Sequence, residues 1–132
     1  MKIKLKEVAG YLSGLMELSE KRLPAKVSYA VMKNQKVLEM EYKDLDQQRV
    51  KLCETYAEQD ENGEYITRDG IYVFSDENRE LFSKEYNDVL EEEIEVNIRL
   101  IAVGELDKCD ESERYDTVTP KDFMTLEFML KE

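Results

Sequence analysis

Residues 25–62, AKVSYAVMKNQKVLEMEYKDLDQQRVKLCETYAEQDEN, contain neither glycine nor proline. Four apolar residues within this stretch are spaced seven apart: Val31, Leu38, Leu45 and Leu52. Residues seven apart lie almost above one another on an α-helix, so the row forms a continuous apolar seam. The stretch therefore predicts one long helix whose seam needs a partner surface.

The limits and the packing of this helix follow from its other residues. Pro24 suits the first turn of a helix, and the polar turn after Glu58 ends it, so we expect a helix from Pro24 to about Glu58. Asn34 and Arg49 fill a dry coiled-coil core poorly. Asn34 either fixes the register of a paired coil or, as is more common, marks where the seam drifts to solvent. We expect the seam to pack against other helices of the same chain, and a homo-oligomer stays open.

An amphipathic helix is predicted over residues 4–21 by apolar residues at alternating spacings of three and four: Leu5, Val8, Leu12 and Leu15. Gly10 and Gly14 lie four apart inside it, and each lowers helix stability by about 1 kcal/mol relative to alanine. They indicate either a close approach of another backbone or a weak helix that packing holds in place.

The segment after the long helix predicts a hairpin and then a third helix. Two β-prone runs, 65–67 and 71–74, flank an Asp69-Gly70 turn signal. Ser75 is a good N-cap, and acidic residues follow it in the first turn. We expect this third helix to run to about Glu92.

The last third of the chain predicts a strand, a loop and a short helix. Apolar residues alternate with other residues over 94–102, which is the clearest strand pattern in the chain. Residues 107–116 indicate an acidic loop. Thr119-Pro120 is typical of a capped helix start, and Phe123, Leu126 and Leu130 would then face the core. Alternation over 124–130 leaves a strand as the alternative.

These elements predict a mainly α (α+β) fold in a single domain spanning 1–132. One long helix would be packed by shorter helices, with a small antiparallel β element from 65–74 and 94–103. A chain of 132 residues can bury a core without disulfides or metals.

Composition restricts the partners of the chain. Nineteen basic and 31 acidic residues give a net charge of −12 and a pI near 4.6. Such a surface repels phosphate backbones and anionic lipids, so we expect no direct nucleic-acid or membrane binding, whereas a basic protein partner is compatible. Cys53 and Cys109 are typical of reduced intracellular thiols, and no apolar run approaches the ~18 residues of a membrane span. The N-terminus lacks a signal-type apolar core, so the chain is interpreted as soluble and cytoplasmic.

No residue is predicted to be catalytic, to bind a cofactor or to ligate a metal. The chain has no histidine, two cysteines cannot build a structural zinc site, and the five glycines form no phosphate-binding loop. Residues 58–69 fit an EF-hand frame in part, with Asp60, Asn62 and Gly63 at positions 3, 5 and 6. Position 12 is Asp69, whose side chain is too short for the usual bidentate contact, and strand rather than helix follows. We therefore expect a hairpin and no calcium site.

Two groups of residues are candidates for contact with a protein partner. Tyr29, Tyr42 and Tyr56 lie on the long helix, and tyrosine is favoured at interfaces. The second group is an acidic run that could imitate a phosphate backbone, together with acids of the 107–116 loop. The residues of that run are Glu91, Glu92, Glu93 and Glu95.

Several phrases of the chain resemble a family of small phage and prophage proteins of Gram-positive bacteria that is known only as a domain of unknown function. The phrases are LPAKVSY (23–29), YAEQDENG (56–63), FSKEYNDVL (82–90), IEV (94–96) and TPKDF (119–123). The resemblance implies a viral origin and carries over no functional residue. The leading hypothesis is a phage-encoded, non-enzymatic protein–protein interaction protein that acts in virion assembly or in the infected cell, in the host cytoplasm. The alternative is an acidic inhibitor that mimics nucleic acid toward a host or defence protein.

Overall fold

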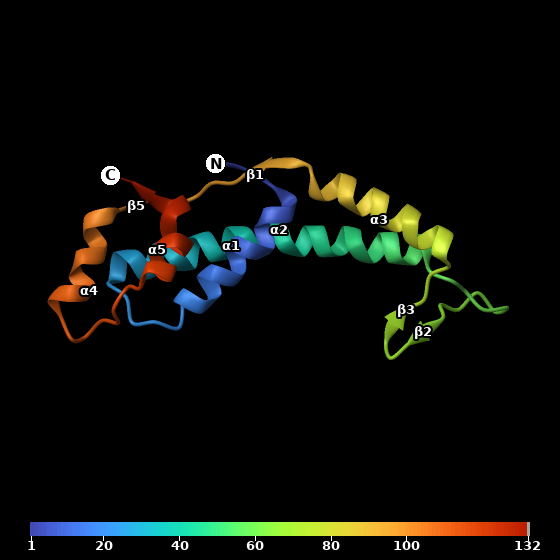
Figure 1. Ribbon diagram of the computed structural model, residues 1–132, viewed down its shortest axis with the longest axis horizontal. Helices are drawn as coiled ribbons and strands as arrows, with labels where there is room; N and C mark the ends of the chain where they lie inside the picture. The colour runs from blue at the N-terminus through green and yellow to red at the C-terminus, as the bar shows by residue number, and fades with distance from the viewer. Residues whose placement is uncertain (132) are drawn as a thin grey trace.

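The structure is a computed structural model that describes residues 1–131 (Figure 1). Its helices are α1 (Leu5–Leu18), α2 (Ala25–Tyr56), α3 (Asp76–Leu90), α4 (Lys108–Glu111) and α5 (Pro120–Leu126), with 3-10 turns η1 (Val103–Asp107) and η2 (Glu127–Met129). Its strands are β1 (Lys2–Lys4), β2 (Thr67–Arg68), β3 (Ile71–Tyr72), β4 (Glu93–Glu95), β5 (Ile101–Ala102) and β6 (Leu130–Lys131). The predicted fold class is confirmed: the chain is mainly α with small β pairs around one long helix.

The long helix α2 is continuous over 32 residues, about 48 Å at ~1.5 Å per residue. Its first residue is preceded by Pro24, whose extended backbone (ψ 147°) makes it the N-cap rather than the first helical residue. Ala57 ends the helix in an extended conformation. The predicted helix is therefore confirmed to within two residues at each end.

The seam of α2 packs within the chain, as predicted. Val31, Leu38 and Leu45 are buried, but Leu52 is only half-buried and Cys53 is buried in its place. An α-helix has 3.6 residues per turn, so a strict heptad row drifts by about 20° per repeat, and after three repeats the next residue faces inward. Helix α2 contacts both α1 and α3, and Figure 1 shows α3 alongside the part of α2 nearer the β2–β3 hairpin.

Asn34 does not drift to solvent, and the sequence-based interpretation of this residue was wrong. Its side chain is fully buried. Its Nδ2 donates to the carbonyl oxygen of Arg99 at 3.0 Å, and its Oδ1 accepts from the Arg99 amide at 2.7 Å. Burial of Asn34 is tolerated because its side-chain amide makes two hydrogen bonds to the backbone of Arg99, as the backbone of a neighbouring strand would.

The predicted strand over 94–102 is divided into two. β4 pairs antiparallel with β1, with Ile94 opposite Ile3, and β5 pairs in parallel with β6, with Ile101 opposite Leu130. The extended segment between them is held by Met1, whose carbonyl accepts from Val96 at 2.9 Å, and by the Asn34 amide. The strand is interrupted because its partner strands are only two or three residues long.

The helix at the C-terminal end begins as predicted and ends early. The Thr119 side chain accepts from the Asp122 amide at 3.2 Å, and the Asp122 carboxylate accepts from the Thr119 amide at 3.0 Å. Leu126 is fully buried, but Phe123 is 42% exposed, which corrects the expectation that it faces the core. The chain turns after α5, so that Met129 is buried instead, and only β6 retains strand character.

The predicted acidic loop contains the short helix α4. Cys109 lies in this helix and is buried against the main core, rather than standing in an open loop. Burial raises the pKa of the Cys109 thiol, as do the charges of Asp110 and Asp116. Both effects favour the protonated thiol over the thiolate.

The main hydrophobic core occupies only one end of the molecule. It is built from α1, the first half of α2, and the segments from Val96 to the C-terminal end. We call residues 1–38 and 91–131 the proximal lobe, and residues 39–90 the distal arm. Figure 1 shows α1, α4 and α5 gathered around one end of α2, whereas α3 and the β2–β3 hairpin extend at the other end. The proximal lobe and the distal arm are joined mainly by α2, which runs through both.

Candidate interaction surfaces

The structure places the three predicted tyrosines on α2 but does not bring them together. Tyr29 is 43% exposed and Tyr42 is 44% exposed, whereas Tyr56 is half-buried and donates to Glu85 of α3 at 2.7 Å. At ~100° per residue, Tyr29 points to nearly the opposite side of the helix from the other two. The three tyrosines cannot form one contact patch.

The predicted acidic run is partly neutralised inside the molecule. Lys4 and Lys6 donate to the carboxylate of Glu91 at 2.7 and 2.8 Å, and these hydrogen bonds lower the pKa of Glu91 to about 2. The N-terminal ammonium group lies 2.8 Å from Glu95 and lowers its pKa too. Glu92 and Glu93 are exposed. The run therefore ties β4 to the N-terminal segment rather than forming a row of unpaired charges.

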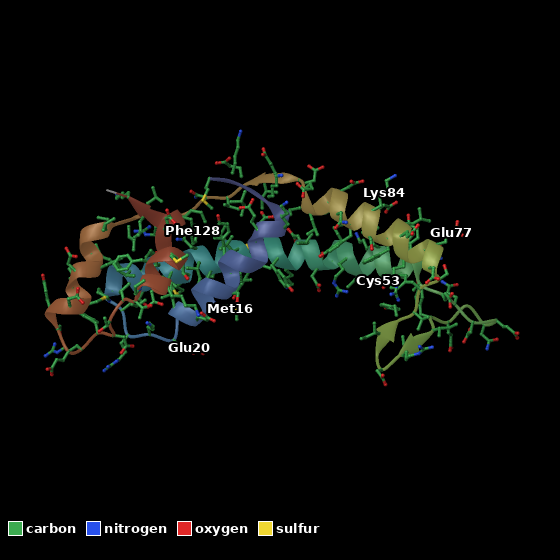
Figure 2. All side chains as sticks on the ribbon, viewed as in Figure 1. Met16, Glu20, Cys53, Glu77, Lys84 and Phe128 are labelled. Atoms are coloured by element: carbon green, nitrogen blue, oxygen red, sulfur yellow. The ribbon has the colours of Figure 1, made fainter. Side chains whose placement is uncertain are left out.

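Charge is segregated along the chain, and the total of −12 conceals this. Residues 21–38 carry five bases and no acid, whereas residues 39–90 carry fifteen acids and six bases. Figure 2 shows the charged side chains of α3, with Glu77 and Lys84 labelled, standing out along the distal arm. The sequence contained this signal, but it appears only when charge is counted by segment.

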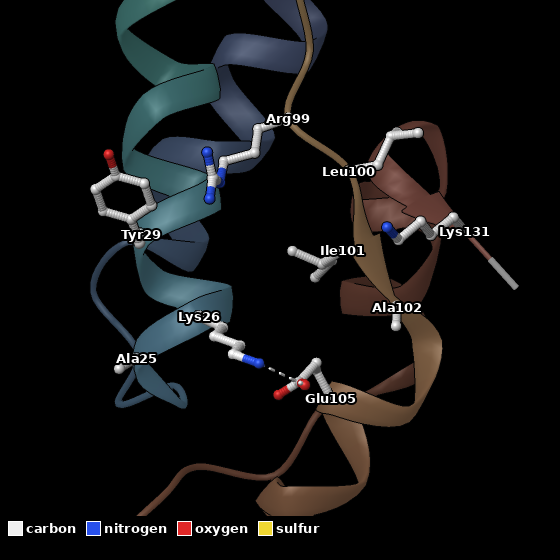
Figure 3. Close-up of a pocket in the computed structure, with 9 residues that line it drawn as sticks. All are labelled: Ala25, Lys26, Tyr29, Arg99, Leu100, Ile101, Ala102, Glu105 and Lys131. Atoms are coloured by element: carbon white, nitrogen blue, oxygen red, sulfur yellow. Dashed lines mark ion pairs between the residues drawn. The ribbon is translucent and has the colours of Figure 1, made fainter.

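A groove runs between the first half of α2 and residues 97–105 (Figure 3). It has a volume of about 460 Å³, and a second, smaller hollow of about 280 Å³ shares Arg99 with it. Basic side chains border the two hollows: Lys26, Lys33, Arg99 and Lys131. We call this feature the basic groove. Sequence reasoning missed it because its residues come from three distant segments.

The electrostatics of the basic groove are positive. Its one acid, Glu105, is shared between Lys108 at 2.7 Å and Lys26 at 3.6 Å, and the Lys108 hydrogen bond is the main cause of its lowered pKa. The Arg99 guanidinium lies 4.8 Å from the centroid of the Tyr29 ring, a cation–π contact. Within residues 1–131, Arg99 has no carboxylate partner. The groove therefore has an exposed, oriented cation on an aromatic wall, a suitable contact for a carboxylate.

A second groove lies between α1 and α2. It has a volume of about 560 Å³ and is lined by Leu12, Met16 and Tyr42, among others. Met16 is 50% exposed, and Figure 2 shows it near the C-terminal end of α1. Methionine adapts its shape to irregular surfaces. This groove is a second place where an apolar side chain of a partner could be accommodated.

The tip of the distal arm is a hairpin with apolar side chains on its surface. Thr67 pairs with Tyr72 across the predicted Asp69-Gly70 turn, in which both turn residues have positive φ. Ile71 is 70% exposed, and every residue from 59 to 71 is exposed. The partial EF-hand frame thus folds as the expected hairpin; the absence of calcium binding stays a prediction.

In the same frame, the Asp60 carboxylate accepts from the backbone amides of Asn62 at 2.8 Å and Glu64 at 3.0 Å. Across residues 1–131, no three carboxylate, thiol or imidazole side chains are grouped as metal ligands. Over the same range, none of the helices combines the length and the apolar character needed to cross a bilayer.

Comparisons of the chain with protein-family models, curated proteins and solved structures find no match.

Proposed function

We propose that this is a phage-encoded, non-enzymatic protein that acts by binding another protein, in virion assembly or in the infected cell. The observation that carries the proposal is the distal arm, a long projection whose tip exposes both apolar and acidic side chains. Its residues add nothing to the main core of the proximal lobe. An arm of this kind serves as a contact surface more readily than as a support for the fold.

The burial pattern of the arm supports this proposal. No residue of α3 is buried, and the arm buries only Leu45, Cys53 and Ala57 on and after α2. Phe74 packs at a tilt against Phe82, which stacks on Tyr86, with ring centroids 5.3 and 5.8 Å apart, and these three rings are half-buried. Other apolar side chains of the arm are well exposed, among them Met40, Ile71 and Leu81. Exposed apolar groups that cluster on a projection are typical of interaction surfaces. The excess of acids on the arm favours a basic surface on the partner.

The test is affinity capture from infected host cells with matched variants. Ile71 on the tip and Met124 on α5 are 70% and 77% exposed, so replacing either with serine should leave the fold intact. We expect the partner to be captured by the wild type and by Met124→Ser, and to bind Ile71→Ser about tenfold or more weakly, because Ile71 is the most exposed large apolar side chain of the tip. A partner that binds all three proteins equally would contradict a role for the tip.

The acidic-inhibitor alternative uses the same arm but gives the main role to its charge, fifteen acids against six bases. Under this hypothesis, charge reversal on the arm and moderate salt would both release the partner, because exposed charges are screened over about 8–10 Å. Reversal of Glu80 and Asp88 to lysine, two exposed acids of α3 on the arm, separates the two hypotheses. We expect binding to survive it, since the affinity in the leading proposal comes from apolar side chains of the tip.

A further inference from the structure

We propose that the basic groove of one copy binds the acidic β2–β3 hairpin of a second copy, so that the chains associate head to tail. The inference deepens the proposed interaction function and rests on it. It commits to a second copy as the occupant of the groove. The argument uses the positions, the charges and the exposed apolar groups of the two surfaces.

The two surfaces lie at opposite ends of the molecule. The groove begins at Ala25, the first residue of α2, and the hairpin follows Tyr56, the last residue. The helix between them spans about 48 Å and is continuous, so the hairpin cannot fold back into the groove of its own chain (Figure 1). Contact between unlike surfaces of identical chains is heterologous and gives rings or open chains rather than closed pairs.

The charges of the two surfaces are complementary. The hairpin segment 58–71 carries five acids and one base. The groove and the smaller hollow present four cations, and Lys26, Lys33 and Arg99 are all exposed. Opposed patches of this kind steer association and fix its orientation. The same charges separate identical ends, because hairpin repels hairpin and groove repels groove.

Apolar groups accompany the charges on both surfaces. Leu100 is 49% exposed and lines the groove across from Tyr29, whose ring contacts the Arg99 guanidinium (Figure 3). Ile71 and Tyr65 are exposed on the hairpin, and the ring of Tyr65 packs edge-to-face against that of Tyr72, with centroids 5.4 Å apart, which stiffens the tip. A stiff tip with one aliphatic and one aromatic side chain is suited to a shallow groove of about 460 Å³.

The experiment is sedimentation velocity of the full chain, from about 10 to about 300 µM, at about 50 mM salt and at about 1 M salt. The groove variant is Lys33→Glu with Arg99→Glu, and the hairpin variant is Glu61→Lys with Glu64→Lys. Lys43→Glu with Lys51→Glu is the control: it changes the net charge as the groove variant does, on exposed positions of the same helix outside the groove. Circular dichroism verifies that each variant is folded.

The wild type and the control should associate beyond a dimer at low salt, and high salt should dissociate them. Each of the other two variants should weaken association about tenfold or more, because several exposed ion pairs are replaced by repulsion. An equal mixture of the two variants should recover association, since each supplies the charge that the other has reversed.

Three outcomes would overturn the inference: a monomeric wild type at every concentration and salt, association that survives both reversals, and failure of the mixture to recover. Failure of this inference is distinguishable from failure of the proposed function. A monomeric protein whose captured partner is lost on Ile71→Ser would retain the interaction function and exclude self-assembly.

Discussion

At the scale of single residues, Asn34 links the long helix to the segment that borders the basic groove. Its amide binds both the N–H and the C=O of Arg99, and its Nδ2 also lies 3.4 Å from the sulfur of Met129. The Arg99 side chain continues from this fixed backbone to the Tyr29 ring. The hydrogen bonds of the buried Asn34 side chain therefore fix the backbone position from which the Arg99 side chain extends.

Replacing Asn34 with alanine should lower the free energy of unfolding by about 1–3 kcal/mol, because two backbone groups of Arg99 lose their partner. Lys36→Ala, on the exposed side of the same helix, should change stability by no more than about 0.5 kcal/mol. Urea unfolding followed by circular dichroism measures both. Equal effects of the two substitutions would mean that the Asn34 bridge does not support the fold.

The two glycines of α1 make a matched pair with opposite expected effects. A Cβ on Gly10 would meet nothing within 4 Å, so Gly10→Ala should stabilise the protein by about 0.5–1 kcal/mol through helix propensity. A Cβ on Gly14 would lie 2.6 Å from Cγ2 of Thr125, so Gly14→Ala should be less stable than Gly10→Ala by about 1–3 kcal/mol.

The close approach at Gly14 is thus to a side chain of α5 rather than to a backbone. Thr125→Ser removes the clashing methyl group but keeps the hydroxyl, which donates to the Lys121 carbonyl at 3.1 Å. Thermal unfolding should show that this second substitution rescues Gly14→Ala. If Gly14→Ala were as stable as Gly10→Ala, the helices α1 and α5 would be packed less closely than described.

At the scale of elements, α2 has two halves with different surroundings. Leu38 is fully buried in the main core, whereas Leu45 is 6% exposed and lies outside that core, on the part of α2 that belongs to the distal arm. Leu38→Ala should lower the free energy of unfolding by about 3–5 kcal/mol, and Leu45→Ala by about 2–3 kcal/mol, since a small cluster collapses more easily around a cavity. Denaturant unfolding of the isolated protein measures both. A loss below about 1 kcal/mol for Leu45→Ala would contradict the burial of this side chain within the chain.

The ion pairs of Glu91, which lies between α3 and β4, with Lys4 and Lys6 should make stability depend on pH. Lys4 and Lys6 lower the pKa of Glu91 from its usual 4.5 to about 2, so the folded protein holds this carboxylate ionised where the unfolded chain would protonate it. The contribution is complete above pH 4.5 and is lost as the pH falls toward about 2. The difference in melting temperature between wild type and Glu91→Gln should therefore shrink over this range.

Glu92→Gln is the control for this pH effect, because Glu92 is exposed and its side chain has no ion pair among residues 1–131. Its melting temperature should follow that of the wild type at every pH. Parallel pH profiles for wild type and Glu91→Gln would contradict the ion pairs of Glu91 with the two lysines.

Local chemistry determines the elements that could be predicted, and tertiary contacts determine the rest. The caps at Ser75 and Thr119 and the Asp69-Gly70 turn act within three residues, and all three form as expected. The division of the strand after Ile94 depends on which segments reach it. Both β1, which pairs with the first part of the predicted strand 94–102, and Asn34, which binds Arg99, lie far from it in the sequence. The residues of 94–102 themselves therefore do not indicate where the strand is interrupted.

The candidate site was predicted less well than the fold. The tyrosines were grouped because they share a helix, yet residue spacing places Tyr29 on the other side of it. The acids at 91–95 were grouped by sequence, yet Lys4 and Lys6 neutralise Glu91 from the other end of the chain. The basic groove joins α2, residues 97–105 and Lys131, which only the tertiary fold brings together.

At the scale of the whole molecule, the proximal lobe and the distal arm differ in how many apolar side chains they bury. The lobe contains the core, and the arm presents acidic and apolar side chains at its tip. An arm held mainly by α2 and α3 should open more easily than the lobe, because few apolar contacts oppose its opening. This difference is the physical basis for treating the arm as a contact surface.

Native-state hydrogen exchange along α2 tests this division most directly, in dilute protein at high salt, where head-to-tail association would be suppressed. We predict that amides from Val31 to Leu38 exchange only through global unfolding, and that amides from Val50 to Tyr56 exchange through a local opening of lower free energy, together with α3. Uniform protection from Ala25 to Tyr56 would contradict the account, because it would mean that the arm is as firmly built as the lobe.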